Sequence, residues 1–97
     1  MPDALVYEFD DLTAANYAAI SRHFGIDPET GVGEWPPGLL SHAAGITDDG
    51  TFIVSEVWSS REDHADWERT LAPALAAHDV TYPPRMRWVP LIAHHQA

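Results

Sequence analysis

The spacing of apolar residues predicts a strand followed by a helix at the start of the chain. Residues 4–10 alternate in the period-2 pattern of a β-strand. One face of this strand carries Leu5, Tyr7 and Phe9. Thr13 is a suitable N-cap for a helix over residues 13–24. Along that helix, apolar side chains recur at helical spacing at Tyr17, Ile20 and Phe24.

A long irregular segment separates this helix from a β-hairpin. Residues 25–38 contain glycine and proline at a density that excludes regular structure. Loops of this length often act as functional lids. Residues 39–46 and 51–58 are rich in strand-forming side chains, and the Asp-Asp-Gly sequence at 48–50 suits a tight turn between them. These two strands should therefore form an antiparallel hairpin.

A second helix is predicted after the hairpin. Ser59 and, three residues later, Glu62 form a capping-box pattern, and acidic residues in the first turn suit the helix dipole. One stripe falls within about an 80° arc of this helix and should face the sheet. The stripe consists of His64, Trp67, Leu71, Leu75 and His78. Pro73 lies inside the pattern and predicts a kink.

A fourth strand over residues 85–94 completes the order βαββαβ, with an interruption at Pro90 that favours an edge strand or a bulge. This order predicts an α+β, ferredoxin-like fold, in which a four-stranded antiparallel sheet carries both helices on one face. A chain of 97 residues is expected to form a single domain, residues 1–97. Apolar residues remain for the other sheet face, including Val6, Val89 and Leu91. We therefore expect a homodimer, in which a second copy covers that face.

Composition narrows the range of functions. The formal net charge of −10 would repel nucleic acids and anionic membrane surfaces. The chain has neither cysteine nor lysine, which excludes disulfides, thiolate nucleophiles and Schiff-base chemistry. We expect no cofactor. Neither a signal-peptide pattern nor an apolar run of roughly 18 residues is present, so a cytoplasmic location is expected.

Two residues in the predicted hairpin are candidates for acid–base chemistry. His42 lies within an apolar strand, where an imidazole needs a partner and can carry a proton near neutral pH. Burial of Glu56 would raise the pKa of this carboxyl toward useful base strength. Alternatively, His42 is a structural histidine, and Glu56 is a rim or interface carboxylate paired with Arg85 or Arg87. The alternation assigns neither residue to a sheet face, because both faces of a barrel are buried.

The second predicted helix carries two further histidines. His64 and His78 share one stripe with Trp67 and lie too far apart to bind a single metal ion. They are therefore candidates for lining a ligand pocket. The alternative is that each marks the edge of the stripe, where a polar tip reaches water.

Several aromatic residues are candidates for ligand contact. The ring of Tyr7 should pack in the core, while its hydroxyl could hydrogen-bond a substrate oxygen. Trp35, in the loop over residues 25–38, would either close a pocket mouth or pin the loop in place. The candidate walls for a flat aromatic ligand are Trp58, Trp67 and Trp88, although tryptophans at these positions also suit a core.

Other site types are not supported. His94 and His95 are adjacent, so their side chains would diverge in a strand and would not chelate a metal. The sequence has no glycine-rich phosphate loop, no Gly-x-Ser-x-Gly and no His-x-x-x-His pattern. We therefore expect no metal site, and the nucleotide-binding and hydrolase classes are disfavoured.

Three stretches resemble small proteins of the dimeric α/β-barrel superfamily, including its antibiotic-biosynthesis-monooxygenase-like branch. The stretches read GLLSHAAG at 38–45, VWSSRE at 57–62 and LAPAL at 71–75. The resemblance extends over nearly the whole chain. Members share an architecture but not a chemistry, and they include cofactor-independent monooxygenases of aromatic polyketides, polyketide cyclases, haem-degrading enzymes and isomerases. The resemblance implies a ligand pocket inside each subunit, between the sheet and its helices, with His42 at a pocket position.

The haem-degrading branch fits this sequence poorly. That branch uses a strand asparagine together with a tryptophan and a histidine on one helix. Trp67 and His78 are eleven residues apart, which differs from the branch spacing by one residue. The first strand offers no asparagine, so haem degradation is disfavoured.

The leading hypothesis is a cofactor-independent monooxygenase or cyclase-type enzyme acting on an aromatic or polyketide-like small molecule by proton transfer in an apolar pocket. Such molecules carry acidic C–H or O–H groups, so one base and one donor to the developing oxyanion would suffice. The predicted base is His42 and the predicted donor is Tyr7, with Trp58 and Trp67 as walls. The alternative is a non-catalytic dimeric protein that binds a small molecule or serves an accessory role.

Overall fold

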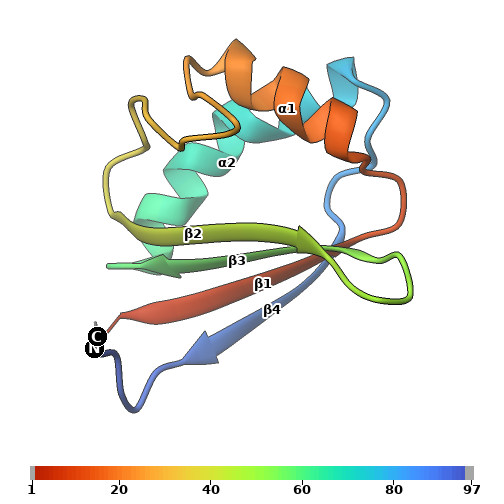
Figure 1. Ribbon diagram of the computed structural model, residues 1–97. Coiled ribbons are helices and arrows are strands. Elements are labelled where there is room, and N and C mark those ends of the chain that lie inside the picture. Colours follow the sequence, from red (N-terminus) through yellow and green to blue (C-terminus); the bar gives the residue numbers. More distant parts are fainter. Residues whose placement is uncertain (1, 96–97) are drawn as a thin grey trace.

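The computed structural model describes residues 2–95, and its elements follow the predicted order. Both helices lie on one face of a four-stranded antiparallel sheet, which confirms the α+β, ferredoxin-like fold (Figure 1). Within the described residues, neither helix is long and apolar enough to cross a membrane. The elements are β1 (Asp3–Phe9), α1 (Ala14–His23), β2 (Leu39–Ile46), β3 (Phe52–Trp58), α2 (Arg61–Ala77) and β4 (Arg85–Pro90).

The strand order is β2-β3-β1-β4, so β2 and β4 form the edges of the sheet. The edge position that Pro90 favoured for the fourth strand is confirmed. The predicted extension of this strand to residue 94 is wrong, because β4 ends at Pro90. Proline has no N–H to donate to β1, and it therefore ends the ladder. The next amide, that of Leu91, donates to the Pro2 carbonyl oxygen at 3.4 Å.

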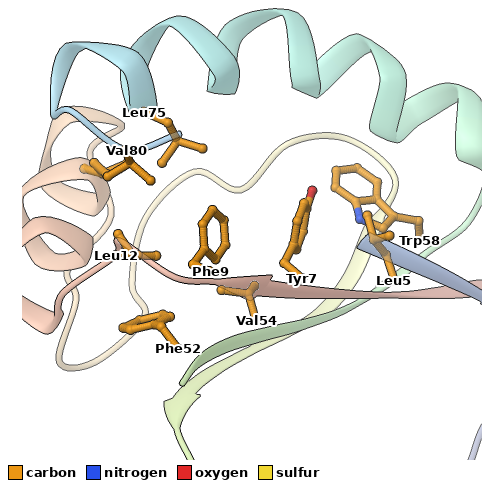
Figure 2. Close-up of a cluster of buried hydrophobic side chains, with 10 residues drawn as sticks. Leu5, Tyr7, Phe9, Leu12, Phe52, Val54, Trp58, Leu75 and Val80 are labelled. Carbon is orange, nitrogen blue, oxygen red and sulfur yellow. The ribbon is translucent and has the colours of Figure 1, made fainter. Parts of the chain in front are cut away.

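The core lies between the sheet and the helices and is built on alternate residues of the two central strands. Leu5 and Trp58 are completely buried, and Tyr7 is 2 % exposed. These side chains point from the sheet toward α2, as Figure 2 shows for Tyr7 and its neighbours. The face of β1 that alternation predicted as buried is therefore confirmed.

Each helix begins at a hydroxyl side chain. Thr13 caps α1 as predicted, and its side chain accepts a hydrogen bond from the Asn16 N–H at 3.1 Å. The cap of α2 lies one residue later than predicted, because Ser60 accepts from the Asp63 N–H at 3.1 Å. Ser59 instead donates to the Asp63 carboxylate at 2.9 Å. Both serines precede an acidic residue by three positions, so the pattern alone does not separate them.

The segment between α1 and β2 is fixed in place at two glycines. A Cβ atom at Gly33 would collide with the backbone carbonyl of Gly25, within the same segment. A Cβ atom at Gly38 would collide with the Asp63 carboxylate at the start of α2, and φ there is +87°. The Gly38 carbonyl also accepts from the Ser59 N–H at 2.8 Å. Residues of this segment therefore pack closely against one another and against the start of α2.

Candidate functional site

A chain of hydrogen bonds joins side chains from α1, β2 and β3. The Tyr17 hydroxyl oxygen lies 2.6 Å from Nε2 of His42, and Nδ1 of His42 lies 2.9 Å from Oε2 of Glu56. The other carboxylate oxygen of Glu56 accepts from the Trp58 indole N–H at 3.0 Å. We call these four residues the His42 chain.

The sheet register brings the two central members of this chain together. His42 on β2 and Glu56 on β3 are direct cross-strand partners. Val54, Glu56 and Trp58 alternate along β3 and are all buried, so Glu56 faces the helices. His42 shares that face, which the sequence left open.

Burial and hydrogen bonding make Nε2 of His42 the basic atom of the chain. The side chain of Glu56 is 6 % exposed and that of His42 is 15 % exposed. When Glu56 is a carboxylate it only accepts hydrogen bonds, so the 2.9 Å contact assigns the hydrogen of His42 to Nδ1 and leaves Nε2 to accept from Tyr17. Burial raises the pKa of Tyr17, which keeps this hydroxyl a neutral donor. A hydroxyl, an imidazole and a carboxylate in this order form the same arrangement as a catalytic triad.

The His42 chain borders an apolar cavity of about 80 Å³ between the sheet and the helices. Tyr17, His42 and Glu56 all line it. The remaining wall is mostly apolar and includes Phe9, Phe24, Val54, Trp67, Leu71 and Leu75. The volume is about half the ~150 Å³ of a cavity that holds benzene. An aromatic ligand would therefore enter only after part of the wall moves.

Trp35 lies between the cavity and the surface, together with several other wall residues. Its ring lies 4.8 Å from the His42 ring, measured between centroids, and its indole N–H donates to the Gly31 carbonyl at 2.9 Å. Trp35 lines the cavity and also two surface hollows that reach His42. This position at the mouth is the one expected of a lid residue.

A second pair of polar side chains lies beside the cavity. The Tyr7 hydroxyl is 2.5 Å from Nε2 of His64, and Tyr7 lines the cavity whereas His64 does not. The His64 ring meets the rings of Trp58 and Trp88 edge to face, with centroids 5.3 Å and 5.2 Å away. Burial lowers the pKa of His64, so its imidazole is neutral at neutral pH. Burial, reinforced by the charge of Glu56, raises the pKa of Tyr7.

The structure places the other sequence candidates away from the cavity wall. His78 is the C-cap residue of α2, beyond the end of the stripe that faces the sheet. Trp58 does not line the cavity, and its indole N–H donates to Glu56. Trp88 lies on β4, and its ring contacts the His64 ring. Among residues 2–95, no three metal-ligating side chains gather in one place.

The alternative interpretation of Glu56 as a partner of Arg85 or Arg87 is wrong. Arg85 bonds Glu8 at 3.2 Å and Asp10 at 3.0 Å. The strand that carries both arginines, β4, pairs with β1 and not with β3. The arginines also alternate with the helix-facing residues of β4, so they lie on the opposite face of the sheet from Glu56.

The sequence pattern predicts Tyr17 only as a core residue of the first helix. Its contact with His42 joins residues 25 positions apart and depends on how α1 crosses the end of the sheet. The one available signal was a tyrosine among otherwise apolar positions of a sheet-facing stripe, because a buried tyrosine hydroxyl usually has a partner.

Comparison with known proteins establishes the fold. No protein-family model and no curated protein sequence matches the chain. The solved structure of Rv0793 from Mycobacterium tuberculosis superposes with a TM-score of 0.64 at 16% identity, over 99% of this chain and 100% of that one. A proposed antibiotic biosynthesis monooxygenase from Chloroflexus aurantiacus J-10-fl superposes with a TM-score of 0.62 at 18% identity, over 98% of both chains. The chain therefore has the same fold as these two proteins, one of which is a proposed antibiotic biosynthesis monooxygenase.

Proposed function

We propose that this protein binds a small aromatic or polyketide-like molecule in the cavity and removes an acidic proton from it with His42. The supporting observation is the His42 chain, a carboxylate-oriented imidazole that ends at a hydroxyl on the wall of an apolar cavity. The substrate proton passes to the Tyr17 oxygen while the Tyr17 proton passes to Nε2 of His42. Glu56 then faces a positively charged imidazolium.

The surroundings of the chain favour this transfer. The Glu56 side chain is 6 % exposed, so its attraction to an imidazolium at 2.9 Å is only weakly screened by water. Both carboxylate oxygens already have partners, one in His42 and one in Trp58, so the charge needs no rearrangement as the proton arrives. Because Trp35 covers His42, the bound substrate would be shielded from solvent.

Two reactions can follow the loss of a proton. In oxygenation, an activated ring methylene reacts with dioxygen, one oxygen atom becomes a ring carbonyl, and the other leaves as water with the two methylene hydrogens. In ring closure, the carbanion attacks a carbonyl carbon of the same molecule. The likeness in fold to a proposed monooxygenase supports the first reaction.

The proton transfer can be tested with 4-nitrophenol, whose ionised form is coloured. Bound to the wild-type protein at a pH one unit below its solution pKa, it should show the phenolate spectrum. In His42→Gln the bound phenol should stay neutral, with the phenolate fraction at least about 10-fold lower, which corresponds to one pKa unit. Absorbance and tryptophan fluorescence titrations measure the ionisation and the binding.

The control is His23→Gln, because His23 is an exposed histidine on α1 away from the cavity. This variant should behave as the wild type. A phenol that binds the wild type but stays neutral would contradict the proposal and support the non-catalytic binding protein. Failure to bind at millimolar phenol would contradict the ligand class itself.

We further propose that a second copy of the chain covers the open face of the sheet. No helix lies on that face (Figure 1). Val6 and Val57 face it, because they alternate with the buried Tyr7 and Trp58, and Val89 is 45% exposed there. The valines share this face with Arg85 and Arg87, which pair with Glu8. Grouped exposed apolar side chains of this kind are usually covered by a partner.

The dimer predicts a clear effect of Val6→Asp. The wild type should sediment as a dimer in analytical ultracentrifugation, whereas the variant should sediment as a folded monomer with an unchanged far-ultraviolet circular dichroism spectrum. Its matched control is Val32→Asp, because Val32 is 73% exposed in the loop before β2. A monomeric wild type would contradict the proposal.

A further inference from the structure

The polar groups beside the cavity extend beyond the His42 chain. The Trp58 ring, whose N–H holds Glu56, meets the His64 ring edge to face, and His64 contacts the Tyr7 hydroxyl. A continuous set of polar side chains therefore crosses the helix-facing side of the sheet. The residues at its two ends, Tyr17 and Tyr7, are both tyrosines that line the same cavity.

The two tyrosine–histidine pairs lie on opposite sides of β3. Tyr7 on β1 is the cross-strand partner of Val54, and His42 on β2 is the partner of Glu56. Their backbones are two strand spacings apart across the sheet, roughly 10 Å. Val54 and Glu56 line the cavity between them. A ligand in the cavity would therefore have one pair on each side.

The two pairs differ in the direction in which a proton can move. Glu56 fixes the hydrogen of His42 on Nδ1, so Nε2 accepts. In the described part of the chain, His64 makes no hydrogen bond to a carboxylate. Burial lowers the pKa of its ring by more than the charges of Glu68 and Glu56 raise it, so the ring is neutral. If the His64 hydrogen is on Nε2, this nitrogen donates to the Tyr7 oxygen. The Tyr7 O–H then points either to Tyr82, whose hydroxyl also neighbours it, or to a ligand in the cavity that Tyr7 lines.

We propose that the substrate is an uncharged enolisable carbonyl compound, which the protein converts between its keto and enol forms with His42 as base and Tyr7 as proton donor. This inference rests on the proposed role of His42. The C–H bond beside the carbonyl breaks, and its proton passes through Tyr17 to His42. The carbonyl oxygen takes the Tyr7 proton, and a C=C bond forms as the C=O bond becomes C–OH. No electrons are gained or lost. After release, His42 gives its extra proton to solvent and Tyr7 takes one proton back from solvent.

The donor role is tested with 2,4-pentanedione, a small uncharged diketone. In deuterated buffer, the wild-type protein should speed the replacement of its central C–H by deuterium, measured by proton NMR. Tyr7→Phe removes only the hydroxyl and should slow this exchange about 100- to 1,000-fold, the usual effect of losing an oxyanion donor. His78→Gln, at the C-cap of the helix that carries His64 and outside the cavity wall, should not change it.

His64 acts here as a positioning residue and has its own measurement. Nitrogen-15 NMR of the wild type should place the His64 hydrogen on Nε2. His64→Gln keeps a side-chain N–H for the Tyr7 oxygen and should retain more of the exchange rate than His64→Leu. A hydrogen on Nδ1, or equal rates in these two variants, would overturn the proposal, whether or not Tyr7→Phe folds.

Failure of this inference is distinct from failure of the proposed function. Tyr7→Phe should still bind 4-nitrophenol as phenolate, whereas His42→Gln should not. A folded Tyr7→Phe variant that exchanges deuterium at the wild-type rate overturns the donor role and leaves the base intact. Wild-type protein that neither ionises the phenol nor speeds the exchange overturns both.

Discussion

Replacing Trp58 by alanine is expected to lower the free energy of unfolding by about 3–5 kcal/mol. Trp58 has no exposed surface and is the largest fully buried side chain of the described residues, so the change leaves a cavity beneath the sheet-facing side of α2. It also removes the N–H that holds a buried carboxylate oxygen of Glu56, which adds about 1–3 kcal/mol for the unpaired group. A small domain is stable by only about 5–15 kcal/mol.

Urea titration followed by circular dichroism measures this loss, and two variants separate its causes. Trp35→Ala removes a half-buried tryptophan from the loop and should cost about 1 kcal/mol or less, as surface changes do. Trp58→Phe keeps most of the buried ring but lacks the N–H, so it should lie between the two. If Trp58→Ala were no less stable than Trp35→Ala, the placement of Trp58 in the core would be wrong.

Replacing Glu56 by glutamine is expected to slow proton transfer by about 10,000-fold, as the amide replacement of a triad carboxylate does. Glutamine is similar in size and can donate an N–H to Nδ1 of His42, which moves the imidazole hydrogen to Nε2. The unprotonated nitrogen is then Nδ1, which faces residue 56 and not Tyr17. Deuterium exchange into 2,4-pentanedione measures the rate, and nitrogen-15 NMR measures the position of the hydrogen.

Glu29→Gln is the matched control, because Glu29 lies exposed in the loop before β2. It should leave both the rate and the hydrogen position unchanged. A Glu56→Gln variant with wild-type exchange would show that the carboxylate only fills space. The stability loss of this variant should be smaller than that of Trp58→Ala, because the side-chain volume is kept.

The sequence was most informative where one face of an element is buried. Alternation along β1 identified Leu5, Tyr7 and Phe9 as core residues, and helical spacing identified the stripe of α2 up to Leu75. The stripe was extended too far, to His78, because spacing alone does not show where a helix ends. The cap of α2 falls at His78 itself.

The site was harder to predict because it is assembled across the sheet. β2 is an edge strand with most of its residues exposed, so the pattern of apolar residues around His42 carries little information about the face it occupies. The pairing of His42 with Glu56 follows from the register of the hairpin. A shift of one residue in that register would put the two side chains on opposite faces of the sheet. Tyr17 joins them only through the path of α1 over the sheet, which no local pattern encodes.

The two glycines that pin the loop before β2 also bear on how quickly a ligand can come and go. Gly33 packs closely against Gly25 and Gly38 against Asp63, so the loop would lose these contacts if it opened as a unit. The Trp35 side chain is held by one hydrogen bond within its own loop and by the His42 ring. Access is therefore expected to follow side-chain rotation, on a timescale well below the microseconds to milliseconds of lid opening.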